Sequence, residues 1–572
     1  MRYLKHLYRL KSLTLVILFL LLTLEVSHAQ SPGDIIADLG FRPEVNGFSF
    51  ENYGEGHDDL TAVEVQRMFG DIACDSSPTG GDNGCVLTPT AQMWMESTNQ
   101  EMSGGHCEGM AALSLLLYTG TENTGPFGGG DTNTLALDGN NPLQREIAFW
   151  WATQMTDPTD TSVVNGKPSE IVNTLVDSMN NKGDTYTVGI YMRDGSGGHA
   201  ITPYAVTDQG GGVYWIMVYD NNWPGAERHI EVDTNAETWQ YNAATNPDEP
   251  ESLYEGDAET NTLSLTPTRP RLQAQNCPFC GNVDYGSNDG LTSVSINAKG
   301  ARLTVTDDKG NVTGYVDGKW VNNIPGAKVV FPKNIFIRGV LPPQMMFPNG
   351  SPFKITATEG PNTPPNDKAT FTVVRSGSIT QVGGVDLSSN PDSLNVDGPS
   401  IQYTSGDGGE TPIIEQAVTN AGDDYRYVVA GNSAMGAGGT VDFSVDPQTG
   451  EFKVGGSDAS QYSVNVDRID EQGNDTNFST NNLDVGAGDT AELNAGTWQD
   501  GGQITGDITG ADGSEVAPID LQDEPQPTDV NSTDNTNDQS SINQSTDTQP
   551  TGASNDTGSS DQGTPAVNST GG

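Results

Sequence analysis

Basic side chains are scarce in this chain. Its 572 residues include 26 Lys and Arg against 76 Asp and Glu, which gives a formal net charge of −50, and no Lys or Arg follows Arg468. A chain of this charge repels the phosphates of nucleic acids, so the composition argues against nucleic acid as a partner. The acidity favours solubility and says nothing about catalysis.

Long apolar runs are missing beyond the N-terminus. There, basic residues from Arg2 to Lys11 precede the apolar run Leu13–Leu24, and small residues including Ser27 and Ala29 follow it. These are the three parts of a secretory signal peptide, and the run is shorter than the ~20 residues that cross a bilayer. We therefore predict a signal peptide over residues 1–29 and a secreted, extracellular mature chain without a membrane span.

Cysteines are few, and there are five in all. Cysteines of an exported chain are expected to pair, because the compartment is oxidising. Cys74 and Cys85 flank a glycine-rich loop and predict a disulfide. Cys277 and Cys280 predict a second one, or a reduced pair if the small ring is too strained. A zinc site would need a second Cys-x-x-Cys pair, which is absent, so we predict no metal and no cofactor, and Cys107 is left as the free thiol.

The surroundings of Cys107 favour a nucleophile. Gly104 and Gly105 precede it, and the apolar stretch that follows predicts a buried helix, with Cys107 in its first turn and Gly120 at its end. Free N–H groups and the positive end of the helix dipole favour a thiolate at this position. A small buried thiol in a core helix is the alternative interpretation.

A base and an orienting acceptor are available further along the chain. His199 lies at the mouth of a predicted strand, and Asp220 and Asn221 follow the end of the next strand. Neighbouring strands of a hairpin place such residues side by side, as a thiolate and its base require. Both Asp220 and Asn221 remain candidates for the third position, and we favour Asp220 because a carboxylate stabilises an imidazolium better than an amide does.

The order Cys, His, Asp or Asn, with the nucleophile at a helix start, resembles papain-like cysteine peptidases over residues 40–245. The Asn-x-Trp spacing of Asn221 and Trp223 is similar to the papain type, whereas an Asp at position 220 is similar to the bacteriocin-processing type. The resemblance implies a protein or peptide substrate. It also implies that Gln100 donates to the oxyanion, although it stands one residue further from the cysteine than in papain. Glu108 departs from the family, which has an aromatic residue after the cysteine.

The coarse pattern predicts an α+β fold for residues 30–284, with helices first and an antiparallel sheet second. The expected helices are 60–69, 89–100, 107–119, 142–155 and 168–180, and the expected strands are 185–192, 199–206, 213–219 and 227–232. This is the layout of the papain-like fold that the resemblance implies, with a central helix packed on the sheet.

Short alternating segments with Gly, Asn, Asp and Pro between them follow from residue 285. They predict one β-sandwich (Ig-like) module over 285–384, with strands near 303–306, 335–337, 353–356 and 369–374, and a second β-rich module over 385–494. Residues 495–572 are rich in Asp, Asn, Ser and Thr and predict a disordered acidic tail.

Three classes of function remain open. The first is a secreted thiol hydrolase, a peptidase, that uses Cys107, His199 and Asp220 or Asn221. The second is a transglutaminase-like acyltransferase with the same triad, in which an amine replaces water. The third is a surface or binding protein whose papain-like domain is catalytically inert.

Overall fold

The computed structural model describes residues 33–75, 84–193, 197–243, 252–285, 290–333, 341–350, 352–360, 363–364, 368–420, 422–470, 474–496, 498 and 502–524. The predicted signal peptide, the predicted strand at 335–337 and residues 525–572 of the predicted tail lie outside these residues.

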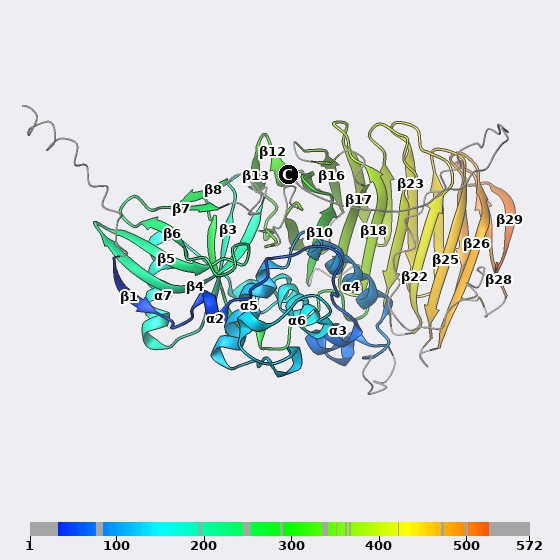
Figure 1. Ribbon diagram of the computed structural model, residues 1–572. Helices are drawn as coiled ribbons and strands as arrows, with labels where there is room; N and C mark the ends of the chain where they lie inside the picture. The colour runs from blue at the N-terminus through cyan, green and yellow to red at the C-terminus, as the bar shows by residue number, and fades with distance from the viewer. Residues whose placement is uncertain are drawn as a thin grey trace, which may run out of the picture. The chain divides into compact units, whose positions relative to one another are not determined.

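Helices are concentrated before the first large sheet, as Figure 1 shows. They are α2 (Pro43–Asn46), α3 (Ala62–Phe69), α4 (Pro89–Met102), α5 (Cys107–Thr119), α6 (Asn141–Ala152) and α7 (Pro168–Asn181), with α8 (Thr268–Arg271) following the sheet. Thr61 and Glu64 form a capping box at the start of α3, and Gly120 ends α5 with a left-handed φ of 73°. The predicted helices are therefore confirmed, with ends shifted by a few residues.

The first sheet is antiparallel and contains the predicted strands. Its members are β1 (Asp34–Asp38), β2 (Val164–Asn165), β3 (Tyr186–Tyr191), β4 (Gly198–Gly210), β5 (Val213–Tyr219), β6 (Arg228–Asp233), β7 (Thr238–Ala243), β8 (Ser252–Asp257) and β9 (Leu263–Pro267). The strand order is β2-β9-β3-β4-β5-β6-β7-β8, with β1 paired to β4. Strands β1, β2 and β7 to β9 were not predicted, and β9 extends the sheet beside β3.

Helices α5 and α7 pack on opposite faces of this sheet. Ala200 of β4 lies against Cys107 and Ala111 of α5, whereas its neighbour Ile201 joins the cluster that includes Ile171 of α7. Successive side chains of a strand point to opposite faces, so this alternation fixes which helix covers which face. The α+β class is confirmed.

Two further antiparallel sheets enclose one hydrophobic core. The order of the first is β14-β15-β10-β17-β18-β21-β22-β25-β26, and that of the second is β13-β12-β11-β16-β19-β20-β23-β24-β27-β28-β29. The strands of the nine-stranded sheet are β10 (Leu291–Asn297), β14 (Lys328–Val330), β15 (Gln344–Pro348), β17 (Lys368–Arg375), β18 (Ser378–Asp386), β21 (Ile413–Val418), β22 (Asp424–Gly431), β25 (Ser460–Ile469) and β26 (Asp475–Val485). Those of the eleven-stranded sheet are β11 (Arg302–Asp307), β12 (Val312–Val316), β13 (Lys319–Asn322), β16 (Phe353–Thr358), β19 (Asp392–Asp397), β20 (Ser400–Thr404), β23 (Thr440–Asp446), β24 (Glu451–Gly456), β27 (Thr490–Asn494), β28 (Gln503–Thr509) and β29 (Glu515–Gln522).

The sheets do not follow the predicted division into a module over 285–384 and a module over 385–494. Strand β18 crosses that boundary, both sheets take strands from both sides of it, and a single core cluster extends from Val294 to Leu521. The predicted start of the tail at residue 495 is also too early, because β28 and β29 follow it. Ile504 and Leu521 of these strands are buried in the same core, and this burial offsets the cost of ordering a polar segment.

The helical part also packs on the nine-stranded sheet. Phe69, Trp94 and Phe279 share a core cluster with Ile379 of β18 and Ala417 of β21. Arg426 of β22 forms an ion pair with Glu96 of α4 at 2.8 Å. The described residues up to Glu524 cluster as one compact unit, so the sequence-based boundary at residue 284 does not mark a separate body.

Both predicted disulfides are present. Cys74 pairs with Cys85, Cys277 pairs with Cys280, and Cys107 is the free cysteine and is buried. The first bridge joins residues that are 11 positions apart and lies just ahead of α4. Cys74 and Leu87 also form an isolated antiparallel bridge, so the disulfide holds two short extended segments together.

We expect the double change Cys74→Ala, Cys85→Ala to lower the free energy of unfolding by about 3 kcal/mol, because a loop of this length gains that much freedom in the unfolded chain. Denaturant unfolding measures this value. The Cys277–Cys280 disulfide closes a much shorter loop, so Cys277→Ala, Cys280→Ala should lower the free energy of unfolding clearly less. Equal losses for the two variants would contradict the loop-length argument.

Candidate functional site

The structure brings Cys107, His199 and Asp220 together. Cys107 is the first residue of α5, His199 stands near the start of β4, and Asp220 follows the last residue of β5. All three are almost fully enclosed, with exposed fractions of 0%, 2% and 0%. Their assembly depends on two antiparallel pairings: β4 with β5, which aligns the strands that carry His199 and Asp220, and β3 with β4, which aligns Ile190 with His199.

The His199 imidazole is held between an acid and a thiol. Its Nε2 donates to Asp220 Oδ1 at 2.8 Å, and its Nδ1 is buried. Burial disfavours the imidazolium, but the Asp220 carboxylate and the Cys107 thiol outweigh burial and raise the pKa of His199 to about 10. With Nε2 engaged by the acid, Nδ1 is the ring nitrogen that is left for the thiol.

Asp220 is kept ionised by three donors. Burial raises the pKa of a carboxyl group, but His199, the Tyr241 hydroxyl and the backbone N–H of Asn222 act against burial and lower the pKa of Asp220. Tyr241 donates to Oδ2 at 2.5 Å, and Asn222 N–H donates to Oδ1 at 2.9 Å. Because both carboxylate oxygens have partners, the acid is fixed in orientation as well as in charge.

Asn221, the other candidate for the third position, contacts the backbone instead of His199. Its Nδ2 donates to the carbonyl oxygens of Cys107 and Ala200, both at 3.0 Å. This amide therefore joins the first turn of α5 to β4, the two elements that carry the thiol and the imidazole. Its role in the structure is to position these elements, and Asp220 is the residue that bonds to the imidazole.

The expected oxyanion donor Gln100 is not brought to the thiol. Helix α4 continues to Met102, so Gln100 lies within its last turn, where the side chain is exposed and its Oε1 accepts from Asn297 Nδ2 at 3.2 Å. The backbone N–H of Cys107 remains as a donor, because the first N–H groups of a helix have no partner within the helix.

The other described histidines have separate partners. His106 bonds to the Tyr53 carbonyl oxygen at 2.9 Å and to Asp59 at 2.8 Å, and His229 stacks on Trp215. Neither of these sets of contacts involves the thiol.

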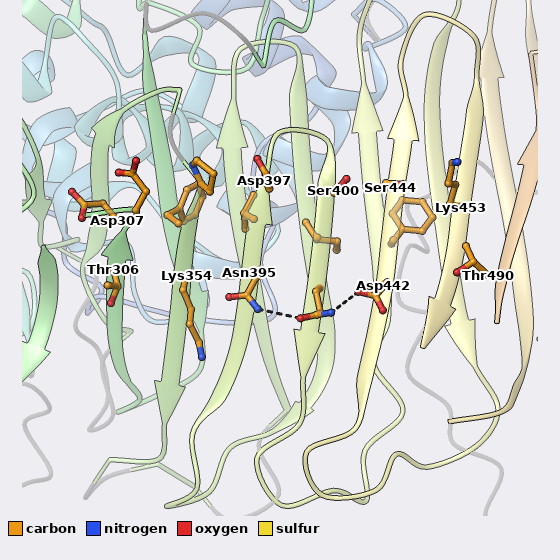
Figure 2. Close-up of a pocket in the computed structure, with 17 residues that line it drawn as sticks. Thr306, Asp307, Lys354, Asn395, Asp397, Ser400, Asp442, Ser444, Lys453 and Thr490 are labelled. Carbon is orange, nitrogen blue, oxygen red and sulfur yellow. Dashed lines mark hydrogen bonds between the residues drawn. The ribbon is translucent and has the colours of Figure 1, made fainter. Parts of the chain in front are cut away.

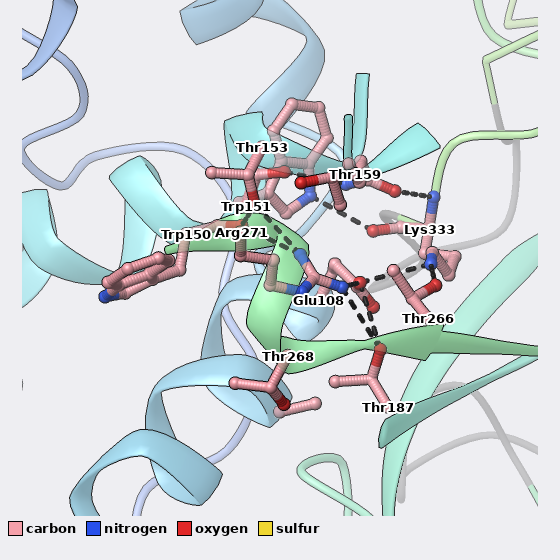
Figure 3. A network of polar contacts seen from close by, with 12 residues as sticks. Glu108, Trp150, Trp151, Thr153, Thr159, Thr187, Thr266, Thr268, Arg271 and Lys333 are labelled. Carbon is pink, nitrogen blue, oxygen red and sulfur yellow. Dashed lines mark hydrogen bonds and ion pairs between the residues drawn. The ribbon is translucent and has the colours of Figure 1, made fainter. Parts of the chain in front are cut away.

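Glu108, which departs from the family pattern, lies in a buried ion network (Figure 3). Its Oε1 accepts from Arg271 Nη2, from Lys333 Nζ at 3.1 Å and from Thr187 Oγ1 at 3.1 Å, whereas its Oε2 has no partner. The exposed fractions of Glu108, Arg271 and Lys333 are 0%, 1% and 3%. The network therefore joins α5 to α8 and to the segment after β14.

The two cations keep Glu108 charged. Burial raises the pKa of its carboxyl group, but Arg271 and Lys333 outweigh burial and lower it. Burial also lowers the pKa of Lys333, and Glu108 acts against this effect. One buried carboxylate facing two cations leaves an excess of positive charge in the turn of the helix next to Cys107.

Sequence reasoning missed Tyr241 and Lys333. The alternation of Trp239 and Tyr241 with polar neighbours is a strand signal that would have located β7. Lys333 ends the apolar run from Val329 to Pro332, and a lysine at the end of such a run indicates a buried ammonium group only if its distant acidic partner is known.

A hollow lies away from the thiol site, on the outer face of the eleven-stranded sheet (Figure 2). It measures about 570 Å³, and most of the surface that lines it is apolar, while its polar side chains include Lys354, Asn395, Gln402 and Asp442. Asn395 donates to Gln402 at 3.3 Å and Gln402 to Asp442 at 2.8 Å, which forms a hydrogen-bonded row across three strands. No residue of the thiol site lines this hollow.

Within the described residues, no group of three or more His, Cys, Asp and Glu side chains is arranged to hold a metal ion. None of the helices in the described part of the chain has both the length and the apolarity needed to cross a bilayer. No match was found among protein-family models, curated proteins or solved structures.

We expect Asn221→Ala to lower the free energy of unfolding by about 2 to 3 kcal/mol, since it leaves two buried carbonyl oxygens without their donor. Asn180→Ala, which removes one exposed hydrogen bond to Ile36, is the matched control and should change stability by less than about 0.5 kcal/mol. Thermal and denaturant unfolding provide the comparison. Equal stability of the two variants would show that Asn221 does not hold α5 on β4.

Proposed function

We propose that this chain is a secreted papain-like cysteine hydrolase that cleaves peptide bonds in a protein or peptide substrate. The observation that carries the proposal is the 2.8 Å bond from His199 to Asp220, buried beside the free cysteine at a helix start. Two disulfides fit a chain that folds in an oxidising compartment. The papain-like assignment rests on the order of the three residues and on a helix packed on an antiparallel sheet.

The proposed reaction follows from the positions of the three side chains. The Cys107 thiolate attacks the carbonyl carbon of the substrate, and the Cys107 N–H stabilises the oxyanion. The His199 imidazolium gives its proton to the leaving amine, which leaves a thioester on Cys107. Neutral His199 then takes a proton from water, the hydroxide attacks the thioester, and the carboxylic acid and the thiolate are released.

Asp220 holds His199 by Nε2 and stabilises its charged form without accepting the proton. Tyr241 and the Asn222 N–H keep Asp220 ionised, so they act through the acid as positioning groups. If an amine took the place of water in the second step, the same residues would perform acyl transfer.

We expect alkylation of Cys107 by iodoacetamide to change less than about threefold between about pH 6 and pH 9, because an ion pair with His199 keeps the thiolate formed. An unperturbed thiol reacts more than about a hundredfold faster at the higher pH, since only its thiolate is nucleophilic. His199→Ala should restore that steep dependence, and Asp220→Ala should restore part of it.

The ratio of the alkylation rates at the two pH values, measured within one variant, does not depend on how often the thiol becomes accessible. Cys107→Ala is the blank, because the other four cysteines are in disulfides. A steep dependence in the unchanged protein would contradict the proposal. New N-termini in a protein mixture identify hydrolysis, whereas incorporation of an added primary amine identifies acyl transfer.

The hollow in Figure 2 favours a second candidate function, which is binding without catalysis. Its row of amide and carboxylate groups offers donors and acceptors to a ligand rich in hydroxyl groups, such as a glycan chain. The complete burial of the triad also agrees with an inert thiol domain.

Under this second function, a soluble neutral glucan or mannan should retard the protein in affinity electrophoresis, and Asn395→Ala with Gln402→Ala should abolish the retardation. Thr404→Ala on the same strand, β20, is the control, since it is not part of the hydrogen-bonded row. Equal retardation of all variants, or none in the unchanged protein, would exclude the hollow as a glycan site.

A further inference from the structure

The thiol site is closed to a substrate as the chain stands. Cys107 and Asp220 have no exposed surface, and His199 is 2% exposed. A peptide bond must come within contact distance of a nucleophile to react, so part of the chain has to move before the site can act. The contacts around the site identify which part covers it.

A segment from the sandwich packs on β3 and on the start of β4, which carries His199. It consists of β14 and the three residues that follow, Lys328–Lys333, and is called the cover segment here. The Phe331 ring lies 5.9 Å from that of Tyr191 on β3. A Cβ placed on Gly198, the residue before His199, would lie 2.8 Å from the Pro332 carbonyl oxygen, so the backbone of the segment closely approaches the start of β4.

The strand register places these contacts on the thiol side of the sheet. Tyr191 pairs with Gly198, and Gly189 pairs with Ala200. Paired residues of an antiparallel sheet share a face, as do residues two apart on one strand. Ala200 packs against Cys107, so the cover segment lies on the face that carries the nucleophile.

Lys333 fixes the end of the segment through polar contacts (Figure 3). Its Nζ donates to Glu108 at 3.1 Å and to Thr266 Oγ1 at 2.7 Å. Its backbone N–H donates to Gln154 Oε1 at 2.9 Å, and its carbonyl oxygen accepts from Trp151 Nε1 at 3.0 Å. Glu108 directly follows the nucleophile, so the anchor lies one residue from Cys107.

We propose that the cover segment is an autoinhibitory strap, which closes the thiol site through Lys333 and keeps the folded chain latent until it is displaced. The inference rests on the proposed function of the site. It explains why Cys107, His199 and Asp220 are almost completely enclosed.

The strap can leave without dismantling either core. Strand β14 has three residues, lies at the edge of its sheet and, among the described strands, pairs only with β15. Besides the ion pair of Lys333, the strap makes one from Lys328 to Asp160 at 2.7 Å, and this pair is partly exposed. Glu108 keeps Arg271 as a partner when Lys333 departs, so opening leaves no isolated buried charge. Segments with these features belong to the low-stability end of a fold.

The test compares the absolute alkylation rate of Cys107 in the unchanged protein and in Lys333→Ala. We expect the variant to react at least about tenfold faster at both about pH 6 and pH 9, because opening becomes more frequent at each pH. Lys309→Ala, an exposed lysine in a turn of the same sandwich, is the control and should leave the rate unchanged. If Lys333→Ala fails to fold, Lys333→Met, which keeps the aliphatic stem, gives the same readout.

A peptide of sequence Lys-Val-Val-Phe-Pro-Lys, added to Lys333→Ala, should slow the reaction again. Alkylation of both Lys333 variants at or below the rate of the unchanged protein would overturn the strap. A steep pH dependence in every variant would contradict the proposed thiolate–imidazolium pair instead, so the failure of one proposal is distinguishable from failure of the other.

Discussion

A carboxylate without any exposed surface is the constraint on which this arrangement depends. Glu108 occupies the first turn of α5, beside the thiol, and an unpaired charge in that place would cost several kcal/mol. Its partners come from far along the chain, Arg271 at the end of α8 and Lys333 after β14. Arg271 pairs with Glu108 from within the helical part, whereas the pair with Lys333 brings a segment of the sandwich onto α5.

The same packing separates two kinds of polar group around Cys107. Asp220, His199 and Tyr241 are joined by hydrogen bonds, and these contacts lower the pKa of Asp220 and raise the pKa of His199. Glu108, Arg271 and Lys333 form a separate ion network, which meets α5 at the turn that carries Cys107. The first contains the imidazole that the proposed reaction uses, and the second holds the segment that we propose as the strap. A chain that is strongly acidic overall thus places two of its few cations next to its free thiol.

Local patterns in the sequence predicted the helices and hairpins that are determined by residues close together in the chain. The glycine loop and apolar run located α5, and the hairpin ending in Asp220 located the partner of His199. Lys333 was missed because its partner, Glu108, is 225 positions away and nothing local marks a lysine as buried. Gln100 was misplaced because α4 continues by one more half-turn. The division of the sandwich was wrong because strand patterns do not show which strands share a sheet.

The central claim is that His199 and Cys107 form a charged pair in the folded chain, and imidazole ¹⁵N NMR tests it most directly. The protein contains six histidines, and His199→Gln assigns the signal. The account predicts that both ring nitrogens of His199 stay protonated from about pH 6 to about pH 9 and that Cys107→Ala alters the signal. A neutral imidazole that titrates near an ordinary pKa of about 6.5, with no response to Cys107→Ala, would contradict it.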